Sequence, residues 1–228
     1  MKNTLAATLL VAATATTAAA QTDSEYRMEI GAGIGTMAYE GDFNGSILSN
    51  MQPMASAVLR RVINPYMALK LSAAYGKLKG SSKDVKTYLP DYTDTPYEFS
   101  NSLIDVSATY EYNFWPYGTG RDYRGSRRLT PFVFAGLGAT YASGSGSNVF
   151  TANLPLGLGV KYKVATRLNL GVEWAAHFSL SDKLDGVADP YGIKSTGLFK
   201  NTDCYSTLQV TLTYSFMPKC RTCHNDDE

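Results

Sequence analysis

The hydrophobic residues of this chain recur at every second position over long stretches. In the segment LNLGVEWAAHFSL, which runs from Leu168 to Leu180, apolar residues occupy one set of alternate positions, while Glu173 and His177 belong to the other set. Unbroken alternation of this kind predicts a β-strand with one apolar and one polar face. The segment is longer than most strands of soluble sheets, which favours a strand that crosses a membrane.

The same pattern appears in other parts of the chain. Five more segments alternate clearly, and they span residues 26–35, 67–76, 104–114, 154–162 and 208–216. Two segments are weaker, because residues 54–60 alternate poorly and residues 130–141 are apolar on both faces. Together the pattern predicts eight strands, an even number, each close to the ~9–11 residues that a tilted membrane strand requires.

The connectors between these segments predict how the strands are arranged. They are short between the second and third and between the sixth and seventh segments, and longer after the first, third, fifth and seventh. Short turns on one side and long loops on the other are typical of an outer-membrane barrel. The predicted fold is a closed eight-stranded antiparallel transmembrane β-barrel with aromatic residues at the strand ends. The alternative is a soluble eight-stranded calyx with its aromatic residues inside.

The start of the chain predicts export from the cytoplasm. Residues 1–20 combine a basic start with a short apolar run that ends in three alanines, as secretory signal peptides do. We therefore expect a barrel over residues 21–217, a periplasmic tail over residues 218–228, and a monomeric protein in the outer membrane of a Gram-negative bacterium, with both termini in the periplasm. A net charge of +1 gives no sign of nucleic-acid binding.

Charged residues occur on the polar face of several predicted strands. An eight-stranded barrel is just wide enough for side chains to fill it, so these residues are expected to pair across the interior. The resulting polar plug would block a pore, and we predict that it contains Arg27, Glu29, Lys70, Asp105, Glu111, Lys161, Glu173 and His177.

The connector over residues 115–129 is the one sizeable loop predicted on the periplasmic side. It carries Arg121, Arg124, Arg127 and Arg128 against a single acidic residue, Asp122. A simple interpretation is a solvated basic turn that touches lipid phosphates. A more specific interpretation is a docking surface for an acidic periplasmic partner.

Two short motifs suggest chemistry. His177 and Ser179 have the His-x-Ser spacing of outer-membrane lipid A deacylases, so a lipid-modifying hydrolase is an alternative function, although both residues are expected to face the interior. The tail contains CRTCH, whose spacing resembles a haem attachment site. A short polar tail cannot build a haem pocket, so we predict no cofactor and no metal site. Cys220 and Cys223 are instead candidates for a disulfide with each other or with a partner.

Several stretches together resemble a known protein family. They are EIGAGIGTMAYEGD, RRVINPYMALKLSAAYGKLKG, LTPFVFAGLGATY and LGLGVKYKVATRLNLGVEWAAHFSLSDKLDGV. In this order they resemble the PorG family of outer-membrane barrels in the type IX secretion system and its relatives in gliding machineries. The resemblance implies a non-enzymatic anchor that ties a periplasmic PorK–PorN ring to the outer membrane. A passive structural or adhesive barrel remains a further alternative.

Overall fold

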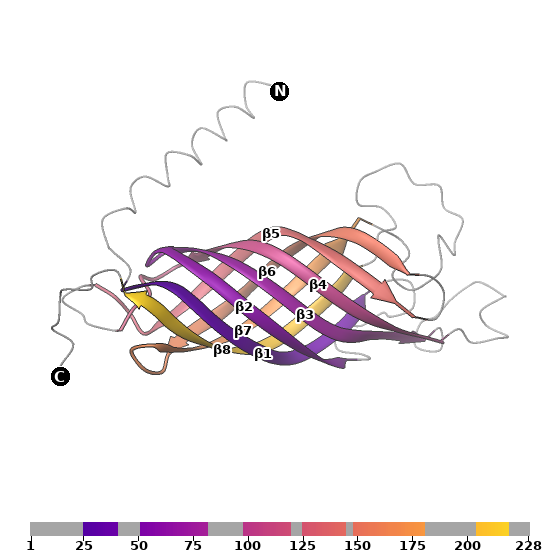
Figure 1. The fold of residues 1–228 in the computed structure, drawn as a ribbon, viewed down its shortest axis with the longest axis horizontal. Coiled ribbons are helices and arrows are strands. Elements are labelled where there is room, and N and C mark those ends of the chain that lie inside the picture. The colour runs from indigo at the N-terminus through magenta and orange to yellow at the C-terminus, as the bar shows by residue number, and fades with distance from the viewer. Residues whose placement is uncertain are drawn as a thin grey trace, which may run out of the picture.

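The computed structural model describes residues 25–40, 51–81, 98–119, 125–144, 148–180 and 204–218. Eight antiparallel strands close into one barrel, in which each strand pairs with its neighbours in the chain and β1 pairs with β8 (Figure 1). The strands are β1 (Tyr26–Glu40), β2 (Gln52–Asn64), β3 (Met67–Ser81), β4 (Glu98–Asn113), β5 (Leu129–Ser143), β6 (Val149–Lys163), β7 (Leu168–Ser179) and β8 (Cys204–Pro218). The predicted fold class is confirmed.

The two ends of the barrel differ in their connectors. The end where β1 begins and β8 finishes is called the terminus end, and its connectors are residues 65–66, 114–128 and 164–167. The other end is called the loop end, and its connectors are residues 41–51, 82–97, 144–148 and 180–203. The connector after β5 is shorter than expected, because β5 and β6 continue to Ser143 and Val149. β8 likewise extends to Pro218, one residue into the predicted tail.

The two segments with weak patterns are regular strands in the structure. Along β2 the side chains alternate between exposed and buried positions, and Arg60 is buried while Arg61 is exposed. Along β5, Phe132 and Phe134 face the interior. They pair across the sheet with Gly159 and Gly157 of β6. Because glycine has no side chain, the two phenylalanine rings have room on the inner side of β5.

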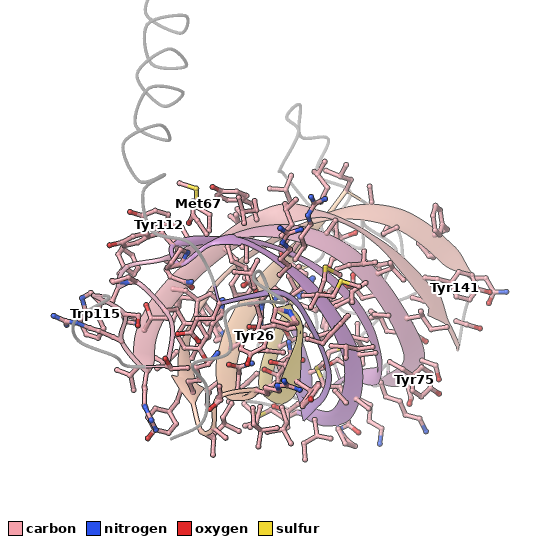
Figure 2. All side chains as sticks on the ribbon, turned by 60° about the vertical axis from the view of Figure 1, so that its left-hand side comes forward. Tyr26, Met67, Tyr75, Tyr112, Trp115 and Tyr141 are labelled. Carbon is pink, nitrogen blue, oxygen red and sulfur yellow. The ribbon has the colours of Figure 1, made fainter. Side chains whose placement is uncertain are left out.

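The outer face of the barrel is apolar and has aromatic residues near both ends. Tyr75, Ile104, Tyr141 and Phe150 succeed one another across β3 to β6 near the loop end and are all exposed. Figure 2 shows Tyr112 and Trp115 at one end of the barrel, with Tyr75 and Tyr141 toward the other. An apolar band between two aromatic girdles is the surface that a membrane-embedded barrel presents to lipid.

Helices do not contribute to the described part of the structure. Among those residues, no helix has the length and apolar character needed to cross a membrane.

Candidate functional site

The middle of the barrel is filled by a layer of paired charges. Three cationic and three anionic side chains form it, and all six are buried; this ionic layer consists of Arg60, Lys70, Lys161, Glu29, Glu111 and Glu173. Equal numbers of opposite charges meet in direct contact, so no member of the layer is left without a partner. Buried charges are tolerated in proteins under this condition.

Arg60 holds the ionic layer together, because it contacts all three of its carboxylates. Its guanidinium nitrogens lie 2.5 Å from Glu29 Oε2, 2.8 Å from Glu111 Oε2 and 3.4 Å from Glu173 Oε1. Arg60 was not among the predicted interior residues, because the alternation around it is weak. The signal was present nonetheless: in β2 the alternate positions 54, 56 and 58 lead to residue 60, whereas Leu59 belongs to the outer face.

The two lysines of the layer lie between acidic and aromatic partners. Lys70 Nζ is 2.7 Å from Glu173 Oε2 and 4.2 Å from the centre of the Phe134 ring. Lys161 Nζ is 2.5 Å from Glu111 Oε2 and 4.1 Å from the centre of the Phe132 ring. Desolvated cation–π contacts of this kind add to the ion pairs. The aromatic side of β5 therefore supports the ionic layer.

A second polar cluster lies between the ionic layer and the loop end. Asp105 Oδ2 accepts hydrogen bonds from Asn153 Nδ2 at 2.5 Å, Tyr205 OH at 2.8 Å and Thr140 Oγ1 at 3.3 Å. The His177 ring stacks on the Tyr205 ring with 4.5 Å between their centres, and its Nδ1 is 3.9 Å from Asp105 Oδ2. These contacts place Asp105 within a network of neutral donors.

A small cavity separates the two polar clusters. Its volume is about 30 Å³, and its lining includes Lys70, Glu173, Asp105 and His177. A buried water molecule needs ~10–15 Å³ measured in this way, so the cavity has room for about two. Such a space can solvate the buried polar groups but does not form a channel.

Apolar side chains close the interior at the loop end. One packed cluster there contains Met37, Tyr39, Met54, Leu78, Leu103, Ala142 and Tyr205. Most of these side chains have no contact with solvent, and the cluster lies beyond the Asp105 network. Ions or polar solutes that enter from the loop end would have to pass these packed side chains to reach the cavity.

The connector after β4 folds back across the terminus end. Tyr117 OH donates a hydrogen bond to Asn169 Oδ1 at 3.0 Å, and the Tyr117 backbone N–H donates one to Pro65 O at 3.1 Å. Thr119 N and Oγ1 donate to Glu25 Oε1 at 3.0 and 2.6 Å. Burial raises the pKa of the Tyr117 phenol, which keeps it a protonated donor. This end of the interior is therefore covered as well.

The predicted polar plug requires one correction. Glu29, Lys70, Asp105, Glu111, Lys161, Glu173 and His177 are buried in the interior, whereas Arg27 is exposed. Arg27 does not pair with Met217 in the β1–β8 ladder, and Met217 has a φ of 59°, so the alternation breaks at this point. As a result Tyr26 packs near Lys163, with 5.6 Å from Nζ to the ring centre, and Arg27 turns outward.

The other predicted site residues are only partly described. Arg127 and Arg128 are exposed, and the Arg127 guanidinium lies 5.1 Å from the centre of the Trp115 ring. Several predicted residues lie outside the described residues: Arg121, Asp122, Arg124, Cys220 and Cys223. In the part of the chain that is described, no group of three or more His, Cys, Asp or Glu side chains could hold a metal ion.

The His-x-Ser pair of β7 is placed unfavourably for hydrolysis of a lipid. His177 and Ser179 are both buried inside the barrel, away from the lipid-facing surface. His177 Nε2 lies 3.4 Å from Thr207 Oγ1, and Ser179 Oγ donates to Thr151 Oγ1 at 3.5 Å. The nucleophile and base of a hydrolase need to contact each other and the substrate. Here each residue contacts a threonine instead.

The filled interior leads to a prediction about permeability. We expect liposomes that contain the purified protein to take up arabinose no faster than protein-free liposomes, and planar bilayers to show no stable conductance steps. The reason is that the apolar cluster, the ionic layer and the folded connector lie in series along the axis. A porin reconstituted in parallel serves as the positive control. Arabinose uptake well above that of protein-free liposomes would show that the interior moves.

The closed barrel, its apolar outer band and its charged interior define a transmembrane β-barrel of the outer-membrane type. The chain belongs to the family described as Domain of unknown function (DUF6089), which it matches over residues 3–225. No curated protein matches it significantly.

Two solved structures of outer-membrane proteins are similar to this chain. Neisserial surface protein A is similar with a TM-score of 0.50 and 15% identity, over 83% of this chain and 97% of that chain. The attachment invasion locus protein Ail of Yersinia pestis, solved with a heparin analogue, has a TM-score of 0.45 and 10% identity over 86% of this chain and 100% of that chain. At such identities the similarity concerns the fold, so function must be argued from the geometry of this chain.

Proposed function

We propose that the protein is an outer-membrane anchor or assembly component of a type IX secretion system, which tethers a periplasmic ring complex to the membrane. The observation that carries this proposal is the filled interior. A barrel whose axis is blocked by the ionic layer, the apolar cluster and the folded connector does not act by transport through its lumen. It acts instead through its ends and its outer surface.

The terminus end is the side on which we propose that the partner binds. In outer-membrane barrels the termini and the short turns lie in the periplasm, and the terminus end has both features. Arg127 and Arg128 are exposed there, on a connector whose backbone is fixed by the hydrogen bond from Gly118 N to Arg127 O at 3.0 Å. A fixed, exposed basic surface suits an acidic partner. The PorG-like stretches of the sequence support PorK- and PorN-like ring proteins as that partner.

The proposal is tested by a tagged pull-down from detergent-solubilised outer membranes, with the co-purifying proteins identified by mass spectrometry. The variant Arg127→Gln/Arg128→Gln is expected to recover severalfold less of the periplasmic ring proteins than the wild type, and recovery by the wild type is expected to fall as salt is raised. Point substitutions are preferable to deletion of the connector, because Tyr117 and Thr119 bond to the barrel.

A matched control is available at the other end of the molecule. Lys77 and Lys79 are also exposed, but they lie toward the loop end of β3. The variant Lys77→Gln/Lys79→Gln loses the same charge and is expected to retain ring proteins at the wild-type level. If the wild-type barrel recovers no periplasmic protein at all, the anchor proposal is wrong. A passive structural or adhesive barrel that acts through its loops would then be favoured.

A further inference from the structure

Several cationic side chains are exposed on the part of the barrel whose side chains the structure describes: Arg27, Arg61, Lys77, Lys79, Arg127, Arg128 and Arg167. The carboxylates of Glu29, Asp105, Glu111 and Glu173 are instead buried in the interior. The outer surface therefore offers cations near both ends of the strands.

Arg61 lies within the apolar outer face. It lies on the exposed side of β2, and the next outward residues along the strand, Leu59 and Ile63, are exposed apolar side chains. Across the β1–β2 ladder Arg61 is paired with Met28, the residue after Arg27. The two arginines therefore lie close together on the side wall of the barrel, near the terminus end.

Arg167 adds a third cation beside the same wall. It lies in the turn between β6 and β7, and its backbone O accepts a hydrogen bond from Ser215 N of β8 at 2.7 Å. Its guanidinium donates to Tyr214 OH at 3.1 Å and lies 5.8 Å from the centre of the Tyr26 ring. Tyr214 is itself an exposed aromatic of the outer face. The guanidinium is therefore held at the level of the aromatic girdle. Arg27, Arg61 and Arg167 are together called the arginine rim.

The position of the arginine rim indicates what covers it. Any occupant of the surface around Arg61 must satisfy a cation and, immediately beside it, exposed Leu59 and Ile63. A phospholipid does both, because its acyl chain covers the apolar residues and its phosphodiester meets the guanidinium. Guanidinium groups bind phosphate oxygens in pairs and are less strongly hydrated than ammonium groups, which suits this boundary. A protein that docks on the aqueous end of the barrel would instead meet the connector with Arg127 and Arg128.

We infer that the arginine rim binds the phosphodiester groups of anionic phospholipids in the leaflet at the terminus end. This inference rests on the barrel crossing a membrane and does not depend on the proposed secretion partner. The rim then sets how deep the barrel lies in the bilayer, because Arg61 fixes the phosphate level relative to the apolar band. Anionic lipids are favoured over zwitterionic ones, because the three guanidinium groups of the rim place several positive charges near the phosphate level.

The test counts the lipids that remain bound to the purified full-length protein. The protein is equilibrated in mixed micelles with equal amounts of phosphatidylglycerol and phosphatidylcholine, and native mass spectrometry measures the retained lipids. The wild type is expected to retain mostly phosphatidylglycerol. The variant Arg27→Gln/Arg61→Gln/Arg167→Gln is expected to lower the ratio of phosphatidylglycerol to phosphatidylcholine by about tenfold.

Three controls keep the result specific. The Lys77→Gln/Lys79→Gln variant removes two cations at the loop end. The logarithm of its ratio of phosphatidylglycerol to phosphatidylcholine is expected to fall by at most about half as much as in the triple variant. A triple Arg→Lys variant of the rim retains most of the selectivity, because the charge remains. Millimolar inorganic phosphate does not displace the lipid, since it lacks the acyl chains. Heat-modifiable gel mobility verifies that each variant is folded.

The inference is overturned if the triple Arg→Gln variant is folded and still shows the wild-type lipid ratio. If that variant also loses a periplasmic protein in a membrane pull-down, the rim is a protein-binding surface instead. The secretion-anchor proposal is tested separately, through Arg127 and Arg128.

Discussion

Replacing Arg60 with leucine is expected to lower the free energy of unfolding by about 3–5 kcal/mol. The substitution removes the cation that contacts Glu29, Glu111 and Glu173, and leaves these three carboxylates with Lys70 and Lys161 alone. A buried carboxylate without its partner pays its full desolvation cost. The loss is measured by urea unfolding of the barrel in lipid vesicles, followed by tryptophan fluorescence and by heat-modifiable gel mobility.

An exposed cation outside the arginine rim provides the control for this experiment. Lys77→Leu removes a positive charge from the exposed side of β3, so its effect is expected to stay within about 0.5 kcal/mol. Adding Glu29→Gln to Arg60→Leu restores the balance of charge and should recover part of the loss. Equal effects of Arg60→Leu and Lys77→Leu would contradict the ionic layer as described.

Replacing Gly157 with valine is expected to lower the free energy of unfolding by about 1–3 kcal/mol, through overpacking. A Cβ at Gly157 would lie 2.3 Å from Phe134 Cζ and 2.4 Å from Trp174 O. The ring could move, but the backbone oxygen of the adjacent strand β7 is held in the ladder. A displaced Phe134 would also leave Lys70 without its aromatic contact. The same unfolding assay measures the effect.

Two variants test whether the loss of stability comes from overpacking at Gly157 or would follow any substitution in β6. Leu158→Val changes the next residue, which is exposed on the outer face, and is expected to have little effect. Phe134→Ala in the Gly157→Val background makes room for the new side chain. The double variant should therefore be less destabilised than the sum of the two single variants. Strict additivity would mean that the glycine and the ring do not constrain each other.

The strands were predictable where one face is uniformly apolar and the other polar. β7 is the clearest case, since its alternation is unbroken from Leu168 and its Glu173 and His177 are buried as predicted. β2 and β5 were harder for different reasons. The inner side of β2 carries apolar Met54 and Val58 as well as Arg60, because it passes from the apolar cluster to the ionic layer. β5 places phenylalanine rings inside, over glycines of the next strand.

The interior pairing was harder to predict than the interior residues. Alternation assigns a side chain to the inside, but the partner of that side chain comes from another strand across the barrel. Arg60 and Glu173 lie on β2 and β7, and they meet only because all eight strands close with one register. Arg27 shows the opposite effect, since the irregular end of the β1–β8 ladder turns it out of the interior although it lies two residues before Glu29.

Local sequence therefore determined the strands, their inner and outer faces, the even strand number and the closed barrel. The strands and their faces follow from the period-two relation between neighbouring side chains, which can be read within each strand segment. Closure follows because a membrane sheet cannot leave an unpaired edge in lipid. The tertiary structure alone decided that three cations and three carboxylates meet in one balanced layer, that Tyr117 folds back over the terminus end, and that Arg27 leaves the interior. These features depend on register and closure, which bring together residues that are far apart in the chain. The local sequence around one residue does not indicate which distant residue will contact it.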